Sequence, residues 1–345
     1  MKFAKAALKP DIKTAKEMIM VKFGCSLEMV NLLTSGPNFI YKQSKSFWTN
    51  YFKFVAAVGF KGIELPFNPF NSDPMAFEMG RCGIPLSAFA VQAKYGSPAE
   101  FMAFLRSVGI EEVTSVHMNA NDVVLEILAA GRKIDDYFAL YEESGLAAID
   151  HVVSLGGKGL VISPSAELGW LEQLVGGNLD GEFTDKTVAV LNKLVAAATA
   201  KGVKVALKTE YWSLFRGPKM AVLLQRVPGA RLCPDLAHLA IAGDPVPVVL
   251  EAHKNDIDFM RLSDTAFTDR VGNFRKINAE IPVEGDQKVF SDLGEGCIDL
   301  LGACRILKDN GYDGWVICEN KKTLDVYKGL LKLGWFVQFE LAGKL

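Results

Sequence analysis

Carboxylate side chains stand at the ends of three short apolar runs in this sequence. These are Glu210, Asp235 and Glu319. Carboxylates move protons as general acids and bases, and their oxygens bind divalent cations. Three of them held together repel one another unless a cation neutralises them, so a divalent metal with oxygen ligands is the economical expectation. Taken singly, each could instead be a solvated residue or the partner of a nearby lysine.

Other side chains near the ends of such runs are candidates for holding a substrate. His238 lies one turn after Asp235, although the two could be only a helix cap and its neighbour. Trp212 could stack on the face of a sugar ring, or could simply anchor a loop. The remaining candidates are His117, Glu64 and Arg261.

Eight short apolar runs, separated by polar turns and by longer segments with helical spacing, must position these residues. The alternation predicts parallel strands joined by helices, and eight such units predict a single-domain (β/α)8 TIM barrel. Helical spacing is clear in residues 47–58 and 184–200, and glycine follows both segments. The predicted strands are residues 21–27, 62–65, 113–117, 159–162, 203–208, 231–233, 259–262 and 315–318.

Two connections are longer than a barrel requires. Residues 66–96 follow the second strand and residues 265–293 follow the seventh. Both stand at the carboxyl ends of the predicted strands, where barrels bind ligands, so we expect them to narrow the pocket. Residues 84–91 could add a further strand. We expect residues 1–20 to be an extension ahead of a barrel domain that spans residues 21–345.

Composition excludes several classes of partner. The chain has 345 residues, a formal net charge of -2 and no basic cluster, which argues against binding of nucleic acid. It has no run of about 18 apolar residues that would predict a membrane span, and residues 1–20 lack the apolar core of a secretory signal. Six scattered cysteines without CxxC spacing favour reduced thiols. We therefore expect a cytoplasmic protein whose partners are small neutral or mildly polar molecules.

Five local patterns occur in a characteristic order: GFKGIEL at residues 59–65, SLGG at 154–157, DLAH at 235–238, LGEGCID at 293–299 and GYDGW at 311–315. From about residue 23 to residue 320 the sequence resembles the xylose isomerase-like TIM-barrel superfamily. This superfamily comprises sugar isomerases and epimerases, with inosose dehydratase and endonuclease IV as relatives. Since dimers and tetramers are common among such barrels, the resemblance also implies a homo-oligomer.

The resemblance implies one divalent metal, Mn²⁺, Mg²⁺, Co²⁺ or Zn²⁺, bound by Glu210, Asp235 and Glu319, with His238 as a substrate contact. The family's fourth ligand is a histidine at strand seven, where this sequence has Arg261. A guanidinium cannot bind a metal because it stays protonated and has no free lone pair. Either the metal keeps three carboxylates and water, or Arg261 itself neutralises the acids and the usual metal is lost.

The function implied is that of a sugar isomerase or epimerase. Glu210 or Glu319 would remove a proton beside a carbonyl, and the other would return it. A dehydratase acting on a keto-sugar or keto-inositol begins with the same proton abstraction. The alternative from another class is a non-catalytic sugar-binding barrel with a degenerate metal site. Hydrolysis of damaged DNA ranks last, because it needs several metal-binding histidines and the sequence has four histidines in all.

Overall fold

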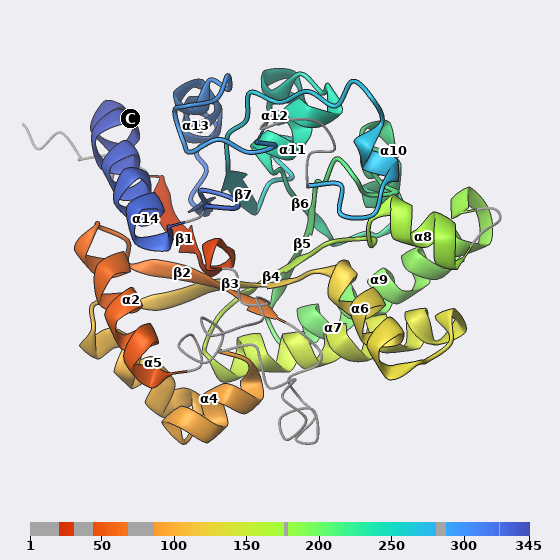
Figure 1. Ribbon diagram of the computed structural model, residues 1–345, viewed down its shortest axis with the longest axis horizontal. Coiled ribbons are helices and arrows are strands. Elements are labelled where there is room, and N and C mark those ends of the chain that lie inside the picture. Colours follow the sequence, from red (N-terminus) through yellow and green to blue (C-terminus); the bar gives the residue numbers. More distant parts are fainter. Residues whose placement is uncertain (1–20, 31–43, 68–85, 176–178, 281–287, 324) are drawn as a thin grey trace, which may run out of the picture.

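The computed structural model describes residues 21–30, 44–67, 86–175, 179–280, 288–323 and 325–345. Within them, eight parallel strands form a barrel that helices surround (Figure 1), so the predicted (β/α)8 architecture is confirmed. The proposed extension, residues 1–20, lies outside the described residues. The strands are β1 (Lys22–Ser26), β2 (Gly62–Phe67), β3 (Glu112–Met118), β4 (Gly159–Ile162), β5 (Lys204–Lys208), β6 (Arg231–Cys233), β7 (Phe259–Leu262) and β8 (Trp315–Cys318).

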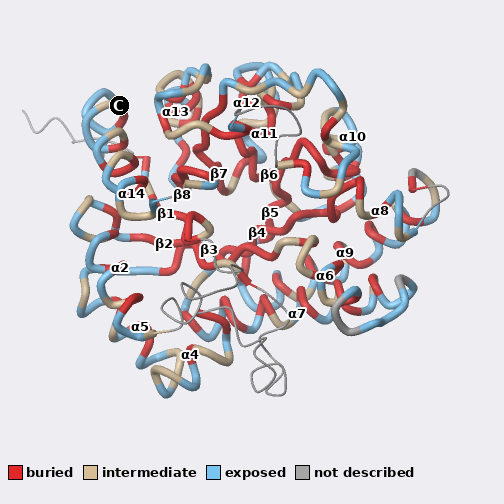
Figure 2. Tube along the Cα trace, in the orientation of Figure 1, coloured by how far each residue is buried: buried red, intermediate tan, exposed pale blue. Residues whose placement is uncertain are grey.

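Helices that are apolar on one side form the outer layer, with buried inner and exposed outer sides (Figure 2). In α9 (Thr184–Ala200), the predicted stripe of Val188, Leu191 and Leu194 is buried. No helix in the described parts of the chain is long and apolar enough to cross a membrane. The other α-helices are α2 (Lys45–Ala57), α4 (Ala88–Tyr95), α5 (Pro98–Ser107), α6 (Ala120–Ala130), α7 (Tyr137–Ser154), α8 (Leu168–Leu174), α10 (Pro218–Arg226), α11 (Leu236–Ala242), α12 (Val246–His253), α13 (Leu300–Asp309) and α14 (Val326–Trp335).

A short seam closes the barrel between β6 and β7. The other neighbouring strands form parallel ladders in the order β6-β5-β4-β3-β2-β1-β8-β7. At the seam, the Leu232 amide donates to the Asp256 carbonyl oxygen at 2.7 Å, and the Arg261 amide donates to the Pro234 carbonyl oxygen at 2.8 Å. Because β6 has only 3 residues, the loops beside it complete the contact. The backbone of Arg261 therefore helps to hold the barrel closed.

Aromatic side chains fill the amino-terminal end of the barrel. Phe259 and Trp315 pair in register at the starts of β7 and β8. A Cβ atom at Gly159 would lie 2.2 Å from the Phe259 ring, and one at Gly62 would lie 2.7 Å from the Trp315 ring. Glycine is needed at both positions because the rings occupy that space. This aromatic floor also contains Val161, Ala206 and Cys233.

The extra strand predicted within residues 84–91 is not formed, because residues 88–91 belong to α4. Ser87 caps this helix, and its side-chain oxygen accepts a hydrogen bond from the Ala90 amide at 3.0 Å. A serine cap satisfies an amide that the first helical turn leaves free, which favours a helix over a strand. Residues 68–85 of the same connection lie outside the described residues.

The tight floor leads to a prediction about stability. In Gly159→Ala, the added methyl group would meet the Phe259 ring and the Thr114 carbonyl oxygen, 2.9 Å away. We expect the free energy of unfolding, measured by urea denaturation, to fall by about 1–3 kcal/mol. Gly343→Ala is the control, since its nearest neighbour would be 3.5 Å away. Equal stability of the two variants would contradict a filled floor.

Candidate functional site

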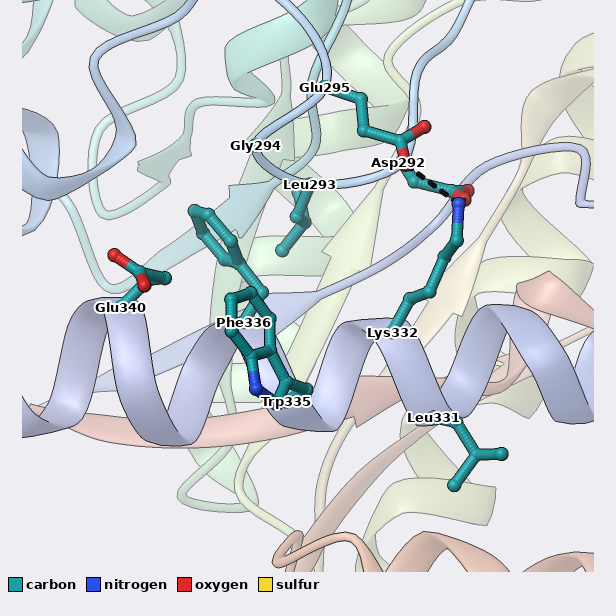
Figure 3. Close-up of a pocket in the computed structure, with 9 residues that line it drawn as sticks. All are labelled: Asp292, Leu293, Gly294, Glu295, Leu331, Lys332, Trp335, Phe336 and Glu340. Carbon is teal, nitrogen blue, oxygen red and sulfur yellow. Dashed lines mark hydrogen bonds and ion pairs between the residues drawn. The ribbon is translucent and has the colours of Figure 1, made fainter.

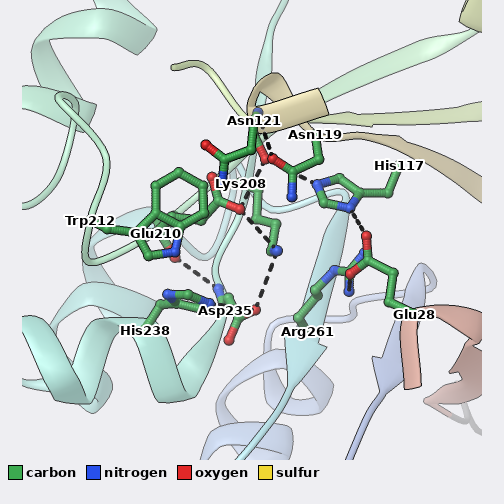
Figure 4. Close-up of polar contacts among 12 residues, drawn as sticks. Glu28, His117, Asn119, Asn121, Lys208, Glu210, Trp212, Asp235, His238 and Arg261 are labelled. Carbon is green, nitrogen blue, oxygen red and sulfur yellow. Dashed lines mark hydrogen bonds and ion pairs between the residues drawn. The ribbon is translucent and has the colours of Figure 1, made fainter. Parts of the chain in front are cut away.

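The layer of the barrel interior above the aromatic floor is charged. Alternate residues of a strand face the same side of the sheet. The side chains of Lys208 and Glu210 therefore point into the barrel interior, as that of Ala206 does, and the side chain of Arg261 points inward, as that of Phe259 does. All three charged residues are buried. Barrel interiors are usually filled by branched apolar side chains, whereas buried charges must find partners. Figure 4 shows these side chains meeting at the carboxyl ends of the strands.

The side chain of Arg261 bonds three carboxylates from other parts of the barrel. Its Nη1 donates to Glu28 Oε2 at 2.9 Å and to Glu319 Oε2 at 2.8 Å, and its Nη2 donates to Glu64 Oε1. Burial opposes the charge on Arg261, but these acids outweigh it and hold the pKa of Arg261 well above its usual range. One guanidinium therefore joins β7 to β2 and to the residues that follow β1 and β8.

Two lysines bridge the carboxylates that the sequence analysis singled out. Lys208 Nζ lies 3.0 Å from Glu210 Oε1 and 3.8 Å from Asp235 Oδ2. Lys321 Nζ lies 3.1 Å from Asp235 Oδ2 and 3.1 Å from Glu319 Oε2. Figure 4 shows the first of these bridges, with Lys208 between its two acids. The structure therefore brings Glu210, Asp235 and Glu319 together, each in contact with an ammonium group.

A chain of polar contacts runs from Glu28 to Glu210. Glu28 Oε1 contacts His117 Nδ1, and His117 Nε2 lies 3.1 Å from Ser163 Oγ. Ser163 Oγ lies in turn 2.9 Å from Glu210 Oε1. Burial lowers the pKa of His117 to about 3, while Arg261 and His117 outweigh burial and hold the pKa of Glu28 well below its usual range. The ionised Glu28 favours the proton of the neutral imidazole on Nδ1, and the Ser163 hydroxyl, which has a single proton, then donates either to His117 Nε2 or to Glu210 and not to both.

Glu210 combines a buried oxygen that has no hydrogen-bond partner in the described chain with a raised pKa. Burial raises the pKa of Glu210 to about 7, although Lys208 opposes the shift. Its Oε1 bonds Ser163 and Lys208, whereas its buried Oε2 has no hydrogen-bond partner among the described residues. A carboxyl group with a free oxygen and a pKa near neutrality can both take and give a proton.

His238 and Trp212 lie at the edge of the charged layer, below part of the connection that follows β7. The Trp212 indole N–H donates to Glu280 Oε1 at 3.0 Å. His238 Nε2 lies 3.8 Å from Asp235 Oδ2 and 3.6 Å from Glu280 Oε1, and it makes no hydrogen bond within the described chain. Burial lowers the pKa of His238 to about 3, so its free Nε2 belongs to a neutral ring.

Sequence reasoning missed four members of this site. They are Glu28, Ser163, Lys208 and Lys321. Strand alternation was a usable signal for the two lysines, because Lys208 precedes Glu210 by two residues and Lys321 follows Glu319 by two. The roles assigned to the eight predicted residues stay predictions. The structure places all eight here: Glu64, His117, Glu210, Trp212, Asp235, His238, Arg261 and Glu319.

The three predicted metal ligands do not fit a divalent ion as they are arranged. Among the described residues, no three side chains of His, Cys, Asp or Glu are grouped to share one ion. Asp235 Oδ2 and Glu319 Oε2 each lie 3.1 Å from Lys321 Nζ, so an ion held at about 2.0–2.6 Å from both oxygens would lie within about 5 Å of that nitrogen. The repulsion between a dication and an ammonium group at about 5 Å is about 7 kcal/mol at an effective dielectric constant near 20.

A hollow on the outer surface of the barrel is a weaker candidate for the site. It lies between α14 with the residues after it and the segment 292–295 (Figure 3). Lys332 donates to Asp292 at 2.8 Å and to Glu295 at 2.7 Å, and Trp335 and Phe336 supply an apolar wall. It contains none of the predicted site residues and none of the buried charges of the barrel interior.

Comparison with known families gives one match that covers most of the chain. The family model of xylose isomerase-like TIM barrels matches residues 52–333. Among proteins with curated descriptions, none matches this sequence.

Solved structures with a similar fold share little sequence identity with this chain. A xylose isomerase-like TIM-barrel protein from Mycobacterium smegmatis, in complex with magnesium, is 13% identical; the match covers 94% of this chain and 98% of that one, with a TM-score of 0.64. D-allulose 3-epimerase from Methylomonas sp. is 17% identical, with 93% and 98% covered and a TM-score of 0.62. A probable 3-DHS dehydratase from Bacillus anthracis is 13% identical, with 92% and 99% covered and a TM-score of 0.60. At these identities the likeness shows a shared fold.

The contacts of Arg261 predict a large loss of stability on its removal. Arg261→Met leaves three carboxylates of the barrel interior without their common partner, so we expect the free energy of unfolding at pH 7 to fall by about 3–5 kcal/mol. Arg231→Met is the control: Arg231 pairs with Asp256 at 3.1 Å, its side chain is 35% exposed, and its loss should cost under about 1 kcal/mol. Similar losses for the two variants, measured by urea denaturation, would show that Arg261 is not essential to the charge balance.

The pKa of Glu210 predicts how stability depends on pH. Folding raises this pKa from 4.5 to about 7, so between those values the native state keeps a proton that the unfolded chain releases. Stability from this group is therefore complete below about pH 4.5 and falls as the pH rises to about 7. Glu210→Gln removes the titration, so the difference in unfolding free energy between wild type and variant should change across this range. Glu251→Gln, at an exposed position, should leave the pH profile unchanged.

Proposed function

The chain belongs to the xylose isomerase-like TIM-barrel family, and on that premise we propose that it is an isomerase or epimerase of sugars or sugar derivatives. In the proposed reaction, one of Glu210 and Glu319 removes a proton from the carbon beside a carbonyl group. The other then returns a proton, either to the neighbouring carbon or to the opposite face of the same carbon. D-allulose 3-epimerase, which shares the fold, supports the choice of a sugar substrate.

The observation that carries this proposal is the state of Glu210. It is buried, its Oε2 is free of hydrogen bonds within the described chain, and burial raises its pKa to about 7. A general base works best when its pKa is close to the operating pH, because it is then both available and strong enough. Glu319 offers a contrast, since Arg261 and Lys321 both bond its Oε2. Two carboxyl groups in unlike surroundings suit a reaction in which one takes a proton and the other gives it.

The buried cations suit the charge that forms during such a reaction. Proton removal beside a carbonyl makes an enediolate, whose negative oxygen must be stabilised by charges or hydrogen-bond donors already in place. Lys208, Lys321 and Arg261 are fixed by their ion pairs, so they need little rearrangement to do this. The free Nε2 of His238 is our choice for a contact to a substrate hydroxyl, with Trp212 beside it as an apolar wall. We assign His117 and Glu64 to the support of these groups and of substrate binding.

A dehydratase is the second candidate, because elimination begins with the same proton abstraction. The fold shared with a probable 3-DHS dehydratase is the specific observation in its favour. The two reactions differ in their second step: an isomerase or epimerase returns the proton, whereas a dehydratase expels a hydroxyl group and makes an unsaturated product. A non-catalytic sugar-binding barrel would do neither.

The experiment is an assay of ketoses, aldoses, 3-keto sugars and keto-inositols in D₂O, each with EDTA and with added Mn²⁺, Mg²⁺ or Co²⁺. We expect one class to gain deuterium at the carbon beside the carbonyl and to give an isomer or epimer, seen by NMR and mass spectrometry. Loss of water from the substrate would instead identify a dehydratase. Binding of a sugar without any deuterium exchange would favour the non-catalytic barrel.

The two glutamates are tested by variants of nearly the same size and shape that lack the carboxyl proton-transfer group. We expect Glu210→Gln and Glu319→Gln to lower kcat by about 10²–10⁴, the usual contribution of a general acid or base. Glu167→Gln is the matched control: burial also raises the pKa of Glu167 to about 7, but both its oxygens already accept hydrogen bonds, from Asn121 and Asn278. If Glu167→Gln loses as much activity as Glu210→Gln, the assignment of the base is wrong.

A further inference from the structure

The ammonium groups of Lys208 and Lys321 contact all three carboxylates that would otherwise converge on a metal. Lys208 joins Glu210 to Asp235, and Lys321 joins Asp235 to Glu319. Both lysines are buried, with side chains 4% and 6% exposed, so their charges are not shared with bulk water. Each of the three acids therefore has a cation of the protein itself within ion-pair distance.

We propose that Lys208 and Lys321 take the place of a divalent ion in this barrel, so that the site works with two ammonium groups and binds no metal. The proposal rests on which carboxylate oxygens the protein's own side chains already contact. Lys321 contacts one oxygen of Asp235 and one of Glu319, and the second Asp235 oxygen already accepts from Ser263 Oγ, so neither oxygen of Asp235 is left for a metal. A metal would have to displace a buried ammonium group whose own charge would then lack a partner.

This assignment differs from both alternatives that the sequence left open, a metal kept by three carboxylates and water, or a site in which Arg261 itself neutralises the acids. The guanidinium of Arg261 forms ion pairs with Glu28, Glu64 and Glu319. It forms none with Glu210 or Asp235 in the described structure. The guanidinium therefore neutralises acids on the β1, β2 and β8 side of the barrel. The two lysines neutralise the carboxylates on the β5, β6 and β8 side.

Lys321 is the ammonium group placed to meet a substrate. It comes from the residues after β8, and its Nζ lies 5.5 Å from the centre of the Phe290 ring in the connection after β7. Lys208 lies deeper, within β5. As a positioned cation, Lys321 would polarise the substrate carbonyl and stabilise the enediolate oxygen, a task that needs charge and not a specific metal. This catalytic role rests on the proposed function, whereas the exclusion of metal does not.

The first test measures metal binding to the wild-type protein after treatment with EDTA. Mn²⁺ is the probe, followed by electron paramagnetic resonance and by calorimetry. We expect no stoichiometric binding at millimolar Mn²⁺ and no shift of the melting temperature. One tightly bound Mn²⁺ per chain would overturn the proposal, and this measurement needs no variant to fold.

The second test removes the ammonium groups one at a time. In Lys321→Met and in Lys208→Met, two carboxylates lose their cation, so we expect affinity for Mn²⁺ to rise by roughly 10²-fold or more. Lys322→Met is the matched control: Lys322 is the next residue, but it pairs with Glu280 at 3.0 Å and contacts none of the three carboxylates. Near-ultraviolet circular dichroism shows which variants fold. If the folded lysine variants bind Mn²⁺ no better than Lys322→Met, the lysines do not occupy the place of an ion.

Activity supplies a separate readout once a substrate is found. We expect EDTA to leave wild-type turnover unchanged, and Lys321→Met to lose turnover and regain part of it with added Mn²⁺. Wild-type turnover that requires a metal would overturn the proposal. If no substrate in the panel reacts, the proposed function fails, while the binding measurements still decide whether the lysines exclude a metal.

Discussion

Charge balance inside the barrel is the constraint on which the rest of the site depends. Within the described part of the chain, five carboxyl groups of the charged layer face three basic side chains, which leaves two negative charges in excess. Burial raises the pKa of Glu64 and of Glu210, and these are the two carboxyl groups that can reduce the excess by holding a proton. The balance sets Glu28, Glu64, Glu210, Asp235 and Glu319 against Lys208, Arg261 and Lys321. The raised pKa of Glu210, which burial causes, therefore lets this group hold one of the protons that the balance requires.

Arg261 couples this balance to the architecture. Its amide closes the seam between β6 and β7, and its side chain reaches the acids of β1, β2 and β8. The backbone of Arg261 is therefore held by a hydrogen bond at the seam, and its side chain is held by ion pairs across the barrel interior. A change in the electrostatics of the site would consequently also affect the closure of the sheet.

The strands could be predicted closely from the sequence, and the ion pairs could not. β4, β6, β7 and β8 match their predicted bounds because each is a short, mainly apolar run followed directly by a polar residue or proline. Lys208 stands inside such a run, where a strand pattern shows its position but not which acid it will meet. Glu28 follows β1 as Glu210 follows β5, so the same positional rule could have found it. The failure of the metal ligands to fit depends on distances between strands, such as those from Lys321 to Asp235 and Glu319, which no single segment encodes.

The aromatic floor closes the amino-terminal end of the barrel interior. Phe259 and Trp315 occupy the amino-terminal end so fully that the facing strands need glycine at Gly159 and Gly62. A small molecule therefore has no through-passage along the barrel axis, and entry and departure share the mouth at the carboxyl ends of the strands. In the proposed reaction, a product would have to leave through that opening before the next substrate could enter. The rate of this exchange would set an upper limit on turnover that faster proton transfer could not raise.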